Sequence, residues 1–328
     1  MSTRFTAIAA DTVDIIESGG YPFGSGWVDI GHDVVRAVTG TRLYLPSDPL
    51  PDLGEAVTPV IEVTGESTLE AGRRLGPGAV ALVFASARNP GGGFLRGTKA
   101  QEEDIARASA LYECLRSVPE FYTFHRNSAD LRYSDRVIYS PDVPVFRRDD
   151  GRLDHPYRLS FLTAAAPNRG AIVRNQPHLL DTVGATLHAR AERVLRVAAA
   201  HGHRTLVLGA WGCGVFANVA DDVVSAFRTA LARVPAFERV VFAVLDRTGS
   251  GPTYRTFANA FAAWGPIVAA LSGGKRRADG RRRESGFGEP HRLSDSESDT
   301  RRVWPATVPR MVRGAVRRPA EVHVAAVR

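Results

Sequence analysis

Hydrophobic residues recur every three or four positions along several stretches of the chain, which is the spacing that predicts amphipathic helices. The first such stretch is Arg4–Ser18, and the glycine pair that follows it is expected to end the helix. A second is Ser67–Arg74, where Ser67 and Glu70 match the capping-box pattern of a helix start. The same spacing predicts further helices over Ala100–Ser117, Pro177–Ala200, Val219–Ala232 and Thr253–Trp264.

Shorter runs between these helices have the composition of β-strands. Ala79–Phe84 reads Ala-Val-Ala-Leu-Val-Phe without interruption, which predicts a strand that is buried on both faces. Other strands are expected over Trp27–Ile30, Arg42–Leu45, Pro59–Val63, Arg136–Ser140, Arg158–Ala164, Thr205–Leu208 and Arg239–Leu245. Strands and helices alternate in the second half of the chain, which is typical of an α/β sandwich with a parallel or mixed sheet.

The net charge of +7 on this chain of 328 residues is confined to its last part. Lys275–Arg328 hold 14 of the 42 Lys and Arg residues and 7 of the 35 Asp and Glu residues, so the remainder holds 28 of each and is neutral. The same segment is rich in Arg, Ser, Gly and Pro, and we expect a disordered tail over 273–328. Its charge fits non-specific contact with anionic polymers, or a tail that is merely solvated. Sequence-specific nucleic-acid binding is not expected of a neutral body.

Little in the sequence indicates a membrane-spanning helix, a metal site or disulfide bonds. No apolar run approaches the roughly 18 residues that a membrane-spanning helix needs, and the first residues lack the features of a signal peptide. Cys114 and Cys213 cannot form a disulfide framework, so a reducing cytoplasm is the simplest expectation. His201 and His203 lie close together, but no third ligand has suitable spacing, and no metal site is expected.

Two glycine-rich loops each follow a predicted strand and lead to a predicted helix. The first contains Asn89 and Gly91–Gly93, and the second is Gly209–Phe216. In open α/β sheets, ligands bind beyond the carboxyl ends of the strands, where glycines let backbone N–H groups approach them. Two such loops side by side predict a diphosphate site. Neither loop matches G-x-G-x-x-G or the P-loop pattern, and each alone is compatible with a tight turn that binds nothing.

Gln101, Glu102 and Glu103 stand at the start of a predicted helix, separated from the triple glycine by seven residues. Acidic residues in a first turn often do no more than complement the helix dipole. Adjacent helical residues point about 100° apart, so Glu102 and Glu103 cannot perform the same task. A carboxyl that donates a proton near pH 7 needs a raised pKa, which an apolar wall and a second carboxylate would supply. The pair therefore also fits general acid/base chemistry.

The triple glycine, the spacer and Gln101-Glu102-Glu103 together resemble the signature of the poly(ADP-ribose) glycohydrolases. Four further segments resemble the microbial-type branch of that family: Ala85–Phe94, Tyr139–Arg147, Ala165–Asn168 and Gly209–Asn218. The similarity extends from about Met1 to Gly265. It implies a macrodomain-like three-layer α/β/α sandwich with a mixed sheet over 76–272, preceded by a mainly helical N-terminal extension over 1–75 that packs on this core.

The resemblance implies hydrolysis of ribose–ribose O-glycosidic bonds in poly(ADP-ribose) from chain ends, with ADP-ribose as product and no cofactor or metal. Glu103 would be the acid/base, Glu102 would hold the distal ribose through a hydroxyl, and Gln101 would order the loop or the ligand. Phe216 would stack on the distal ribose or the adenine side, and Val215 would narrow the cleft beyond the terminal unit. The expected substrate contacts are Asn89, Gly91, Gly92, Gly93, Gln101, Gly212, Cys213, Gly214, Val215 and Phe216.

Two other functions fit the same loops. A non-catalytic reader of ADP-ribose would not need two glutamates at the helix start, and a mono(ADP-ribosyl) hydrolase would act on modified protein or nucleic acid in the same cleft. No histidine motif accompanies Cys213, which is expected to be a small apolar residue of its turn rather than a nucleophile. Arg107, four residues after Glu103, is spaced for a salt bridge that would oppose an acid role for that glutamate. The chain is expected to act as a monomer.

Overall fold

A seven-stranded mixed sheet forms the centre of the computed structural model, which describes residues 2–246, 248–262 and 264. Its strands are β3 (Arg42–Tyr44), β4 (Val60–Thr64), β5 (Ala79–Phe84), β6 (Val137–Arg147), β7 (Leu153–Ala164), β8 (Thr205–Leu208) and β9 (Arg239–Ala243). They lie in the order β3–β6–β7–β5–β8–β9–β4. β7, β5, β8, β9 and β4 are parallel, whereas β6 is antiparallel to both of its neighbours. The carboxyl ends of these five parallel strands therefore meet at one edge.

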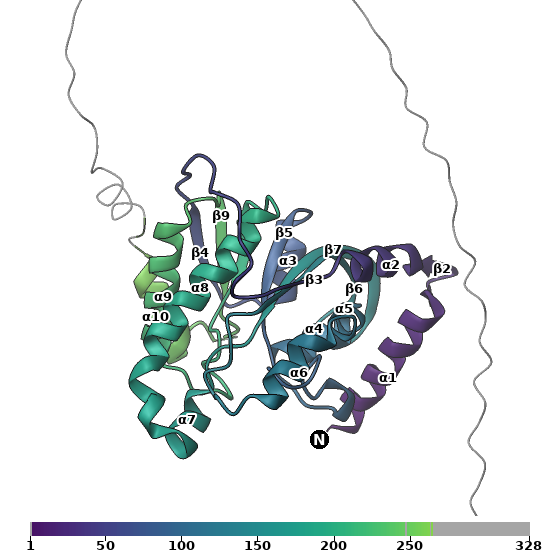
Figure 1. The fold of residues 1–328 in the computed structure, drawn as a ribbon. Helices are drawn as coiled ribbons and strands as arrows, with labels where there is room; N and C mark the ends of the chain where they lie inside the picture. Colours follow the sequence, from purple (N-terminus) through teal and green to yellow (C-terminus); the bar gives the residue numbers. More distant parts are fainter. Residues whose placement is uncertain (1, 247, 263, 265–328) are drawn as a thin grey trace, which may run out of the picture. The chain divides into compact units, whose positions relative to one another are not determined.

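Helices cover both faces of the sheet, because its central strands bury side chains on both sides. In β5, Val80 and Leu82 pack into one core, whereas Ala81 and Val83 pack into the other. The first core is covered by α7 (Arg169–Asn175), α8 (Val183–Ala200), α9 (Ala220–Arg233) and α10 (Pro252–Phe261). The second is covered by α1 (Thr3–Ser18), α2 (Gly31–Gly40), α3 (Thr68–Leu75), α4 (Gln101–Ala108), α5 (Leu111–Arg116) and α6 (Pro119–Asn127). The expected three-layer α/β/α sandwich is thus confirmed (Figure 1).

Several elements begin and end where local sequence signals place them. The capping box of α3 is present: Ser67 Oγ accepts a hydrogen bond from Glu70 N (3.0 Å), and Glu70 Oε2 accepts one from Ser67 N (2.9 Å). α1 ends at Gly19, whose N–H bonds to carbonyl groups of the last turn. The buried strand Ala79–Phe84 has the expected bounds. These elements depend on contacts within a few residues, which a sequence pattern can record.

The single helix expected over Ala100–Ser117 is instead two helices, α4 and α5. Ser109 between them is extended (φ −145°, ψ 173°) and forms a bridge with Val145 of β6. The N–H of Ala110 donates to Pro144 O (3.1 Å). Contacts with a strand replace helical hydrogen bonds at this point, and the strand lies far away in the sequence.

Other expected elements need smaller corrections. The helix predicted over Pro177–Ala200 begins with a 3₁₀ turn, η2 (Pro177–Thr182), and becomes α-helical at Val183. The strands predicted over Arg136–Ser140 and Arg158–Ala164 extend into a long hairpin, β6–β7, whose register shifts twice. Some elements have no predicted counterpart: α2, α6, α7 and strand β1 (Gly20–Phe23), which pairs with β2 (Gly26–Asp29).

The first 75 residues supply strands of the central sheet as well as a layer of helices. α1, α2 and α3 pack on one face, as a helical extension should. β3 and β4 of the same segment form the two edges of the seven-stranded sheet. The expected extension and core consequently share one sheet, and residue 75 does not separate two structural units. The tail expected over 273–328 lies outside the described residues.

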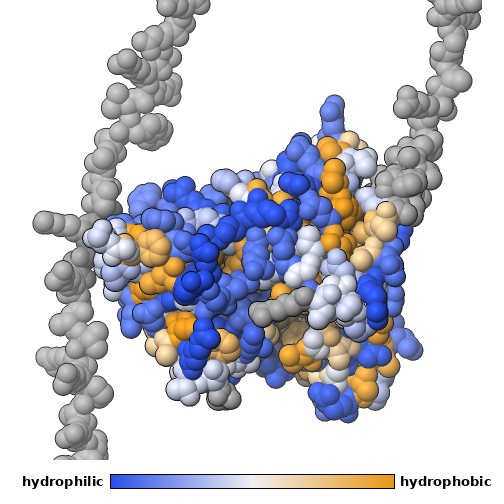
Figure 2. All heavy atoms as spheres, turned by 180° about the vertical axis from the view of Figure 1, so that it is seen from behind, coloured by the Kyte–Doolittle hydropathy of each residue, from blue (hydrophilic) through white to orange (hydrophobic). Residues whose placement is uncertain are grey.

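One face of the molecule is mainly polar. On the face shown in Figure 2, hydrophilic residues cover most of the area and hydrophobic residues gather in separate patches. None of the helices in the described ranges is long and apolar enough to cross a membrane. Among the large hydrophobic side chains, Val215 of the second glycine loop is the most exposed of those recorded, at 85%.

Candidate active site

The two glycine loops lie next to each other at the carboxyl edge of the sheet. The first follows β5 and the second follows β8, and these strands are parallel neighbours. The chain after β7 contacts the second loop: Trp211 Nε1 donates to Ala164 O (3.0 Å), and Asn218 Nδ2 donates to Pro167 O (2.9 Å). Gly212 (φ +74°) has no room for a side chain, since a Cβ there would lie 2.4 Å from Asn218 Nδ2. Three chain segments therefore build one site.

The first glycine loop is held against the first turn of α4. Gly93 N donates to Glu103 Oε1 (2.9 Å), and a Cβ on Gly92 would lie 2.4 Å from the same oxygen. The loop also turns back on itself, because Gly92 N donates to Asn89 O (3.0 Å). Glu103 is 8% exposed. The loop thus fixes one carboxylate oxygen of Glu103 in a nearly buried position.

Glu102 is buried more deeply, with 3% of its surface exposed. Ser86 N, just beyond β5, donates to its Oε2 (2.6 Å), whereas its Oε1 has no hydrogen-bond partner within the described residues. Burial raises the pKa of Glu102 well above its usual range; the amide of Ser86 opposes this rise, the charge of Glu103 adds to it, and the amide of Gly91 opposes it. Glu102 therefore keeps its proton to a higher pH than an exposed glutamate.

Gln101 links the start of α4 to the sheet and to α3. Its Oε1 accepts a hydrogen bond from Phe84 N (2.8 Å), and its Nε2 donates to Leu82 O (2.8 Å) and to Thr68 Oγ1 (3.0 Å). The side-chain N–H groups are thus engaged by protein atoms. This arrangement fixes the helix turn that carries the two glutamates.

Arg107 pairs with Asp104 rather than with Glu103. Its guanidinium bonds Asp104, donates to Thr98 O (2.6 Å) and lies 4.7 Å from the ring centroid of Phe5. The salt bridge spaced for Glu103 is therefore replaced by one with the next acidic residue of α4. Glu103 keeps its contact with the glycine loop.

The two loops use their backbone N–H groups differently. In the first, Gly92 N and Gly93 N already donate to protein oxygens. In the second, the N–H groups of residues 214–216 donate to no acceptor in the part of the chain that the structure describes. An anion would therefore find free donors in the second loop, whereas in the first Gly92 N is occupied by Asn89 O and Gly93 N by Glu103.

A cavity of about 960 Å³ opens beside the second glycine loop and the start of α4. Its size suits a small-molecule ligand, for which pockets of about 300–1,000 Å³ are usual. The expected site residues on its wall are Gln101, Gly212, Cys213, Gly214, Val215 and Phe216. The others do not line it: Asn89, Gly91, Gly92, Gly93, Glu102 and Glu103. The glutamates lie directly after Gln101 in α4, buried against the first loop.

Comparison with known proteins connects this geometry to a family. A family model described as the microbial-type PARG catalytic domain matches residues 9–148. Poly(ADP-ribose) glycohydrolase from Thermomonospora curvata, known from a crystal structure, has 47% sequence identity with this chain. The match covers 79% of this chain and 100% of the Thermomonospora curvata chain, with a TM-score of 0.74. This chain belongs to the microbial-type poly(ADP-ribose) glycohydrolase family.

Other glycohydrolase structures agree. The Thermomonospora curvata enzyme bound to the inhibitor ADP-HPD is 47% identical, with coverage of 79% and 100% and a TM-score of 0.71. The enzyme from Deinococcus radiodurans in complex with ADP-ribose is 42% identical over 70% of this chain and 96% of that one, with a TM-score of 0.64. No curated protein sequence matched.

The cysteine in the second loop of this glycohydrolase is a poor nucleophile. Burial raises the pKa of Cys213 to about 12, with a smaller contribution from the charge of Asp222. Since the thiolate is the reactive form, Cys213 is inert near neutral pH. This agrees with the expectation of a small apolar residue in a turn.

Tyr133 belongs to the site, although the sequence pattern does not mark it. Its backbone has a positive φ (63°), which is uncommon for a non-glycine residue and is maintained by the surrounding structure. The ring packs against Ala85, Ala87 and Ala165, and its centroid lies 6.0 Å from that of Phe216. These partners come from three distant parts of the chain, so no local periodicity could reveal the contact.

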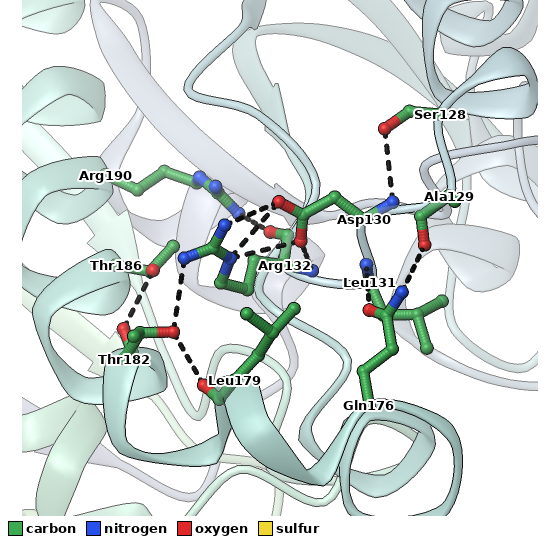
Figure 3. Close-up of polar contacts among 10 residues, drawn as sticks. All are labelled: Ser128, Ala129, Asp130, Leu131, Arg132, Gln176, Leu179, Thr182, Thr186 and Arg190. Carbon is green, nitrogen blue, oxygen red and sulfur yellow. Dashed lines mark hydrogen bonds and ion pairs between the residues drawn. The ribbon is translucent and has the colours of Figure 1, made fainter.

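A polar network holds the segment that carries Tyr133 (Figure 3). Arg190 of α8 is 1% exposed, and its Nη1 donates to the carbonyl oxygens of Arg132 (2.8 Å) and Ala165 (2.7 Å). Asp130 pairs with the guanidinium of Arg132 (2.7 Å), as Figure 3 shows. Arg190 thus connects the segment before β6, which carries Tyr133, to the chain after β7.

The histidines weighed as metal ligands have other partners. His201 Nε2 lies 2.8 Å from Tyr44 Oη, and His203 Nε2 lies 2.9 Å from Tyr139 Oη. Among the described residues, no group of three or more His, Cys, Asp or Glu side chains could hold a metal ion. His201 and His203 therefore belong to a packed aromatic cluster.

Proposed function

We propose that this protein hydrolyses ribose–ribose O-glycosidic bonds of poly(ADP-ribose) and releases ADP-ribose, with Glu103 as the acid/base. One observation carries this assignment: two glutamates on the first turn of α4 are pinned by backbone amides of the first glycine loop and of the chain after β5. A pure binding module would not need buried carboxylates there. Membership of the glycohydrolase family supports the same activity.

Glu103 carries out both proton transfers of the proposed reaction. Its protonated carboxyl donates to the oxygen of the leaving ribose as the glycosidic bond breaks. The resulting carboxylate then removes a proton from the water that attacks the oxocarbenium-like carbon. The hydrogen bond from Gly93 to Oε1 holds the carboxyl in place during both steps.

Glu102 positions the sugar in this proposal. Its raised pKa favours a neutral carboxyl, which can donate to one ribose hydroxyl oxygen and accept from another group. Ser86 N already occupies Oε2, so the unpartnered Oε1 is the atom that would meet a hydroxyl. A neutral Glu102 also avoids a second buried negative charge next to the carboxylate form of Glu103.

The second glycine loop binds the diphosphate in this scheme, because the amides of residues 214–216 have no acceptor among the described residues. Phe216 stacks on the distal ribose, supported from behind by Tyr133. The exposed Val215 narrows the cleft past the terminal unit, which favours attack at chain ends. Asn89 and Gly91 contact the substrate from the side of the first glycine loop. The complex of ADP-ribose with the Deinococcus radiodurans enzyme supports this type of ligand.

Further proposals concern the fold type, the cellular compartment and the oligomeric state of the enzyme. We assign the sandwich to the macrodomain type and place the enzyme in the cytoplasm as a monomer. Two cysteines without a paired motif suit a reducing compartment. Two carboxyls and a water suffice for glycosidic cleavage, so the scheme contains no metal or cofactor. ADP-ribosylated protein is a second substrate class in which the same cleft would meet a different leaving group.

Replacing Glu103 by glutamine tests the acid/base role. Glu103→Gln keeps the side-chain oxygen that accepts from Gly93, but it cannot exchange a proton. We expect turnover of purified polymer to fall by about 10²–10⁴-fold, while the affinity for ADP-ribose, measured by calorimetry, stays within about twofold. ADP-ribose release is followed by chromatography.

The matched control is Glu113→Gln on α5, which removes a partly exposed carboxylate paired with Arg116 and should retain wild-type turnover. Unchanged turnover in Glu103→Gln would refute the acid/base assignment. Release from a singly modified protein, without release from polymer, would move the activity to mono(ADP-ribosyl) hydrolysis. Binding of ADP-ribose without release from either substrate would leave only the reader function.

A further inference from the structure

Basic side chains lie next to the two glycine loops, outside the wall of the cavity, although the body of the chain is neutral. Segments 85–100 and 165–180 contain five Lys and Arg residues and no Asp or Glu, and segment 209–220 contains no charged residue. These three segments are the loops that follow β5, β7 and β8. Three of these five residues, together with Arg126 of helix α6, form what we call the basic rim: Arg88, Arg126, Arg169 and Arg174.

One half of the basic rim lies against the second glycine loop. Arg169 Nη1 donates to Ala217 O (3.5 Å). Gly170 N donates to Phe216 O (2.9 Å), and Arg174 Nη1 lies 3.8 Å from the point that a Cβ on Gly170 would occupy. Arg169 is therefore held beside the loop whose Phe216 is proposed to stack on the distal ribose, and Arg174 lies on the same helix as the residue that bonds Phe216.

The other half lies beyond Tyr133. Arg126 Nη1 donates to Arg88 O (2.8 Å), which joins α6 to the first glycine loop. The Tyr133 ring centroid lies 5.7 Å from that of His125, the residue before Arg126, and 6.0 Å from that of Phe216. Residues next to both halves in the chain, His125 and Gly170, thus contact a single aromatic pair, Tyr133 and Phe216.

No acidic side chain in the described ranges pairs with the basic rim. None of its four arginines forms an ion pair within the described residues. The acids of the neighbouring segment are already taken: Asp130 pairs with Arg132 (2.7 Å), and Asp135 pairs with Arg190 (2.8 Å). Positive charge without compensation at the edge of a cleft attracts an anion.

We infer that the basic rim binds the diphosphate of the ADP-ribose unit on the leaving side of the scissile bond. The inference rests on the proposed function, because it takes Phe216 and Glu103 to mark the position of that bond. The leaving ribose carries its own diphosphate on its 5′ carbon, one sugar away from the bond that breaks. Guanidinium groups bind phosphate oxygens through paired, charge-assisted hydrogen bonds. The rim therefore adds affinity for polymer over substrates with a single ADP-ribose unit.

Two substrates with the same scissile bond separate the basic rim from the primary site. One is the ADP-ribose dimer, and the other is its analogue in which the leaving unit is adenosine and carries no diphosphate. In Arg88→Gln/Arg169→Gln, KM for the dimer should rise about tenfold, and its dependence on salt should weaken. KM for the adenosine analogue and Kd for ADP-ribose should change by less than about twofold.

The matched control is Arg42→Gln/Arg204→Gln, which removes two exposed charges from the edge strand β3 and from the amino end of β8. An equal rise in KM for the dimer in both double variants overturns the inference, and so does an unchanged KM. A loss of ADP-ribose affinity in Arg88→Gln/Arg169→Gln also overturns it, because the arginines would then serve the primary site.

Two further measurements separate the remaining explanations. If single-stranded DNA competes less well against the rim variant than against the control, the basic rim is a nucleic-acid surface and the inference fails. If the wild type cleaves neither substrate, the proposed function fails. The dimer is then titrated against Glu103→Gln with and without the rim substitutions, and equal Kd values overturn the rim inference separately.

Discussion

The first glycine loop lies against the first turn of α4 at Gly92 and Gly93. A Cβ at Gly92 would lie 2.4 Å from Glu103 Oε1 and 3.2 Å from Glu102 Oε2. The backbone is also left-handed there (φ +61°), a conformation that costs other residues about 1–2 kcal/mol. The glycine therefore does more than allow a turn, because its missing side chain is the space that both carboxyls occupy.

Gly92→Ala should damage catalysis more than folding. The added methyl group must push the Glu103 carboxyl aside, and a displacement of about 1 Å in a catalytic group costs on the order of a hundredfold in turnover. We expect kcat on polymer to fall by about that factor, while the free energy of unfolding in urea falls by only about 1–2 kcal/mol.

The control for Gly92→Ala is Gly184→Ala in α8, where a Cβ would meet nothing within 4 Å. It should fold at least as stably as the wild type and turn over polymer at the same rate. If Gly92→Ala retained full kcat, the close contact between the loop and Glu103 would have no catalytic importance.

At the scale of elements, Gln101 links the start of α4 to the sheet. Gln101 reaches back to both N–H and C=O groups of β5 and to Thr68 of α3. The helix is only eight residues long and ends where Ser109 leaves the helical conformation. So short a helix is not stable by itself, and its position depends on such anchors.

Gln101→Leu should loosen the start of α4. It leaves Phe84 N and Leu82 O without partners, at a cost of about 1–3 kcal/mol for each group that stays buried. We expect a lower free energy of unfolding in urea and a fall in kcat that exceeds any change in ADP-ribose affinity, because the glutamates lose their fixed geometry.

Leu195→Ala in α8 is the comparison for this prediction. It destabilises the opposite helical layer by about 2–5 kcal/mol without touching α4. Its kcat at a temperature where it is folded should equal that of the wild type. An equal loss of kcat in both variants would mean that stability alone, and not the Gln101 anchor, governs turnover.

The elements also show which features of the fold and the site could be predicted from the sequence. The capping box at Ser67, the buried strand Ala79–Phe84 and the two glycine loops follow from neighbouring residues, and each is present as expected. The break at Ser109 and the role of Tyr133 follow from contacts with distant strands and loops, which no local pattern records. The same holds for the occupied amides of the first loop, since a glycine pattern does not show what its N–H groups bond.

At the scale of the whole molecule, buried histidines in different parts of the fold act together on stability. Burial lowers the pKa of His125 to about 4 and that of His201 to about 4, and it also lowers the pKa of His203. His125 is enclosed near Tyr133, whereas the other two pack on Tyr139 beside the sheet. All three are neutral in the folded state at pH values where the unfolded chain binds protons.

Stability should therefore fall as the pH falls from about 6.5 to about 4. In this window the unfolded state takes up protons at its histidines, near a pKa of about 6.5, and the folded state does not, so the free energy of unfolding decreases. Above about 6.5 the contribution is fully present. Glu102 acts in the opposite sense, because its raised pKa lets the folded state bind a proton that the unfolded state has lost. Only a comparison with a histidine variant isolates the histidine contribution.

His125→Gln provides that comparison, since glutamine can still bond Phe121 O and Ser134 Oγ, the two partners of His125. Urea unfolding at pH 7, 6, 5 and 4 should give a shallower decline in the variant, with a difference on the order of 3 kcal/mol at pH 4 relative to pH 7. His178→Gln, at an exposed position, should keep the wild-type slope. Parallel pH profiles for His125→Gln and the wild type would contradict the prediction, since a buried neutral imidazole that resists protonation must appear as a difference in slope.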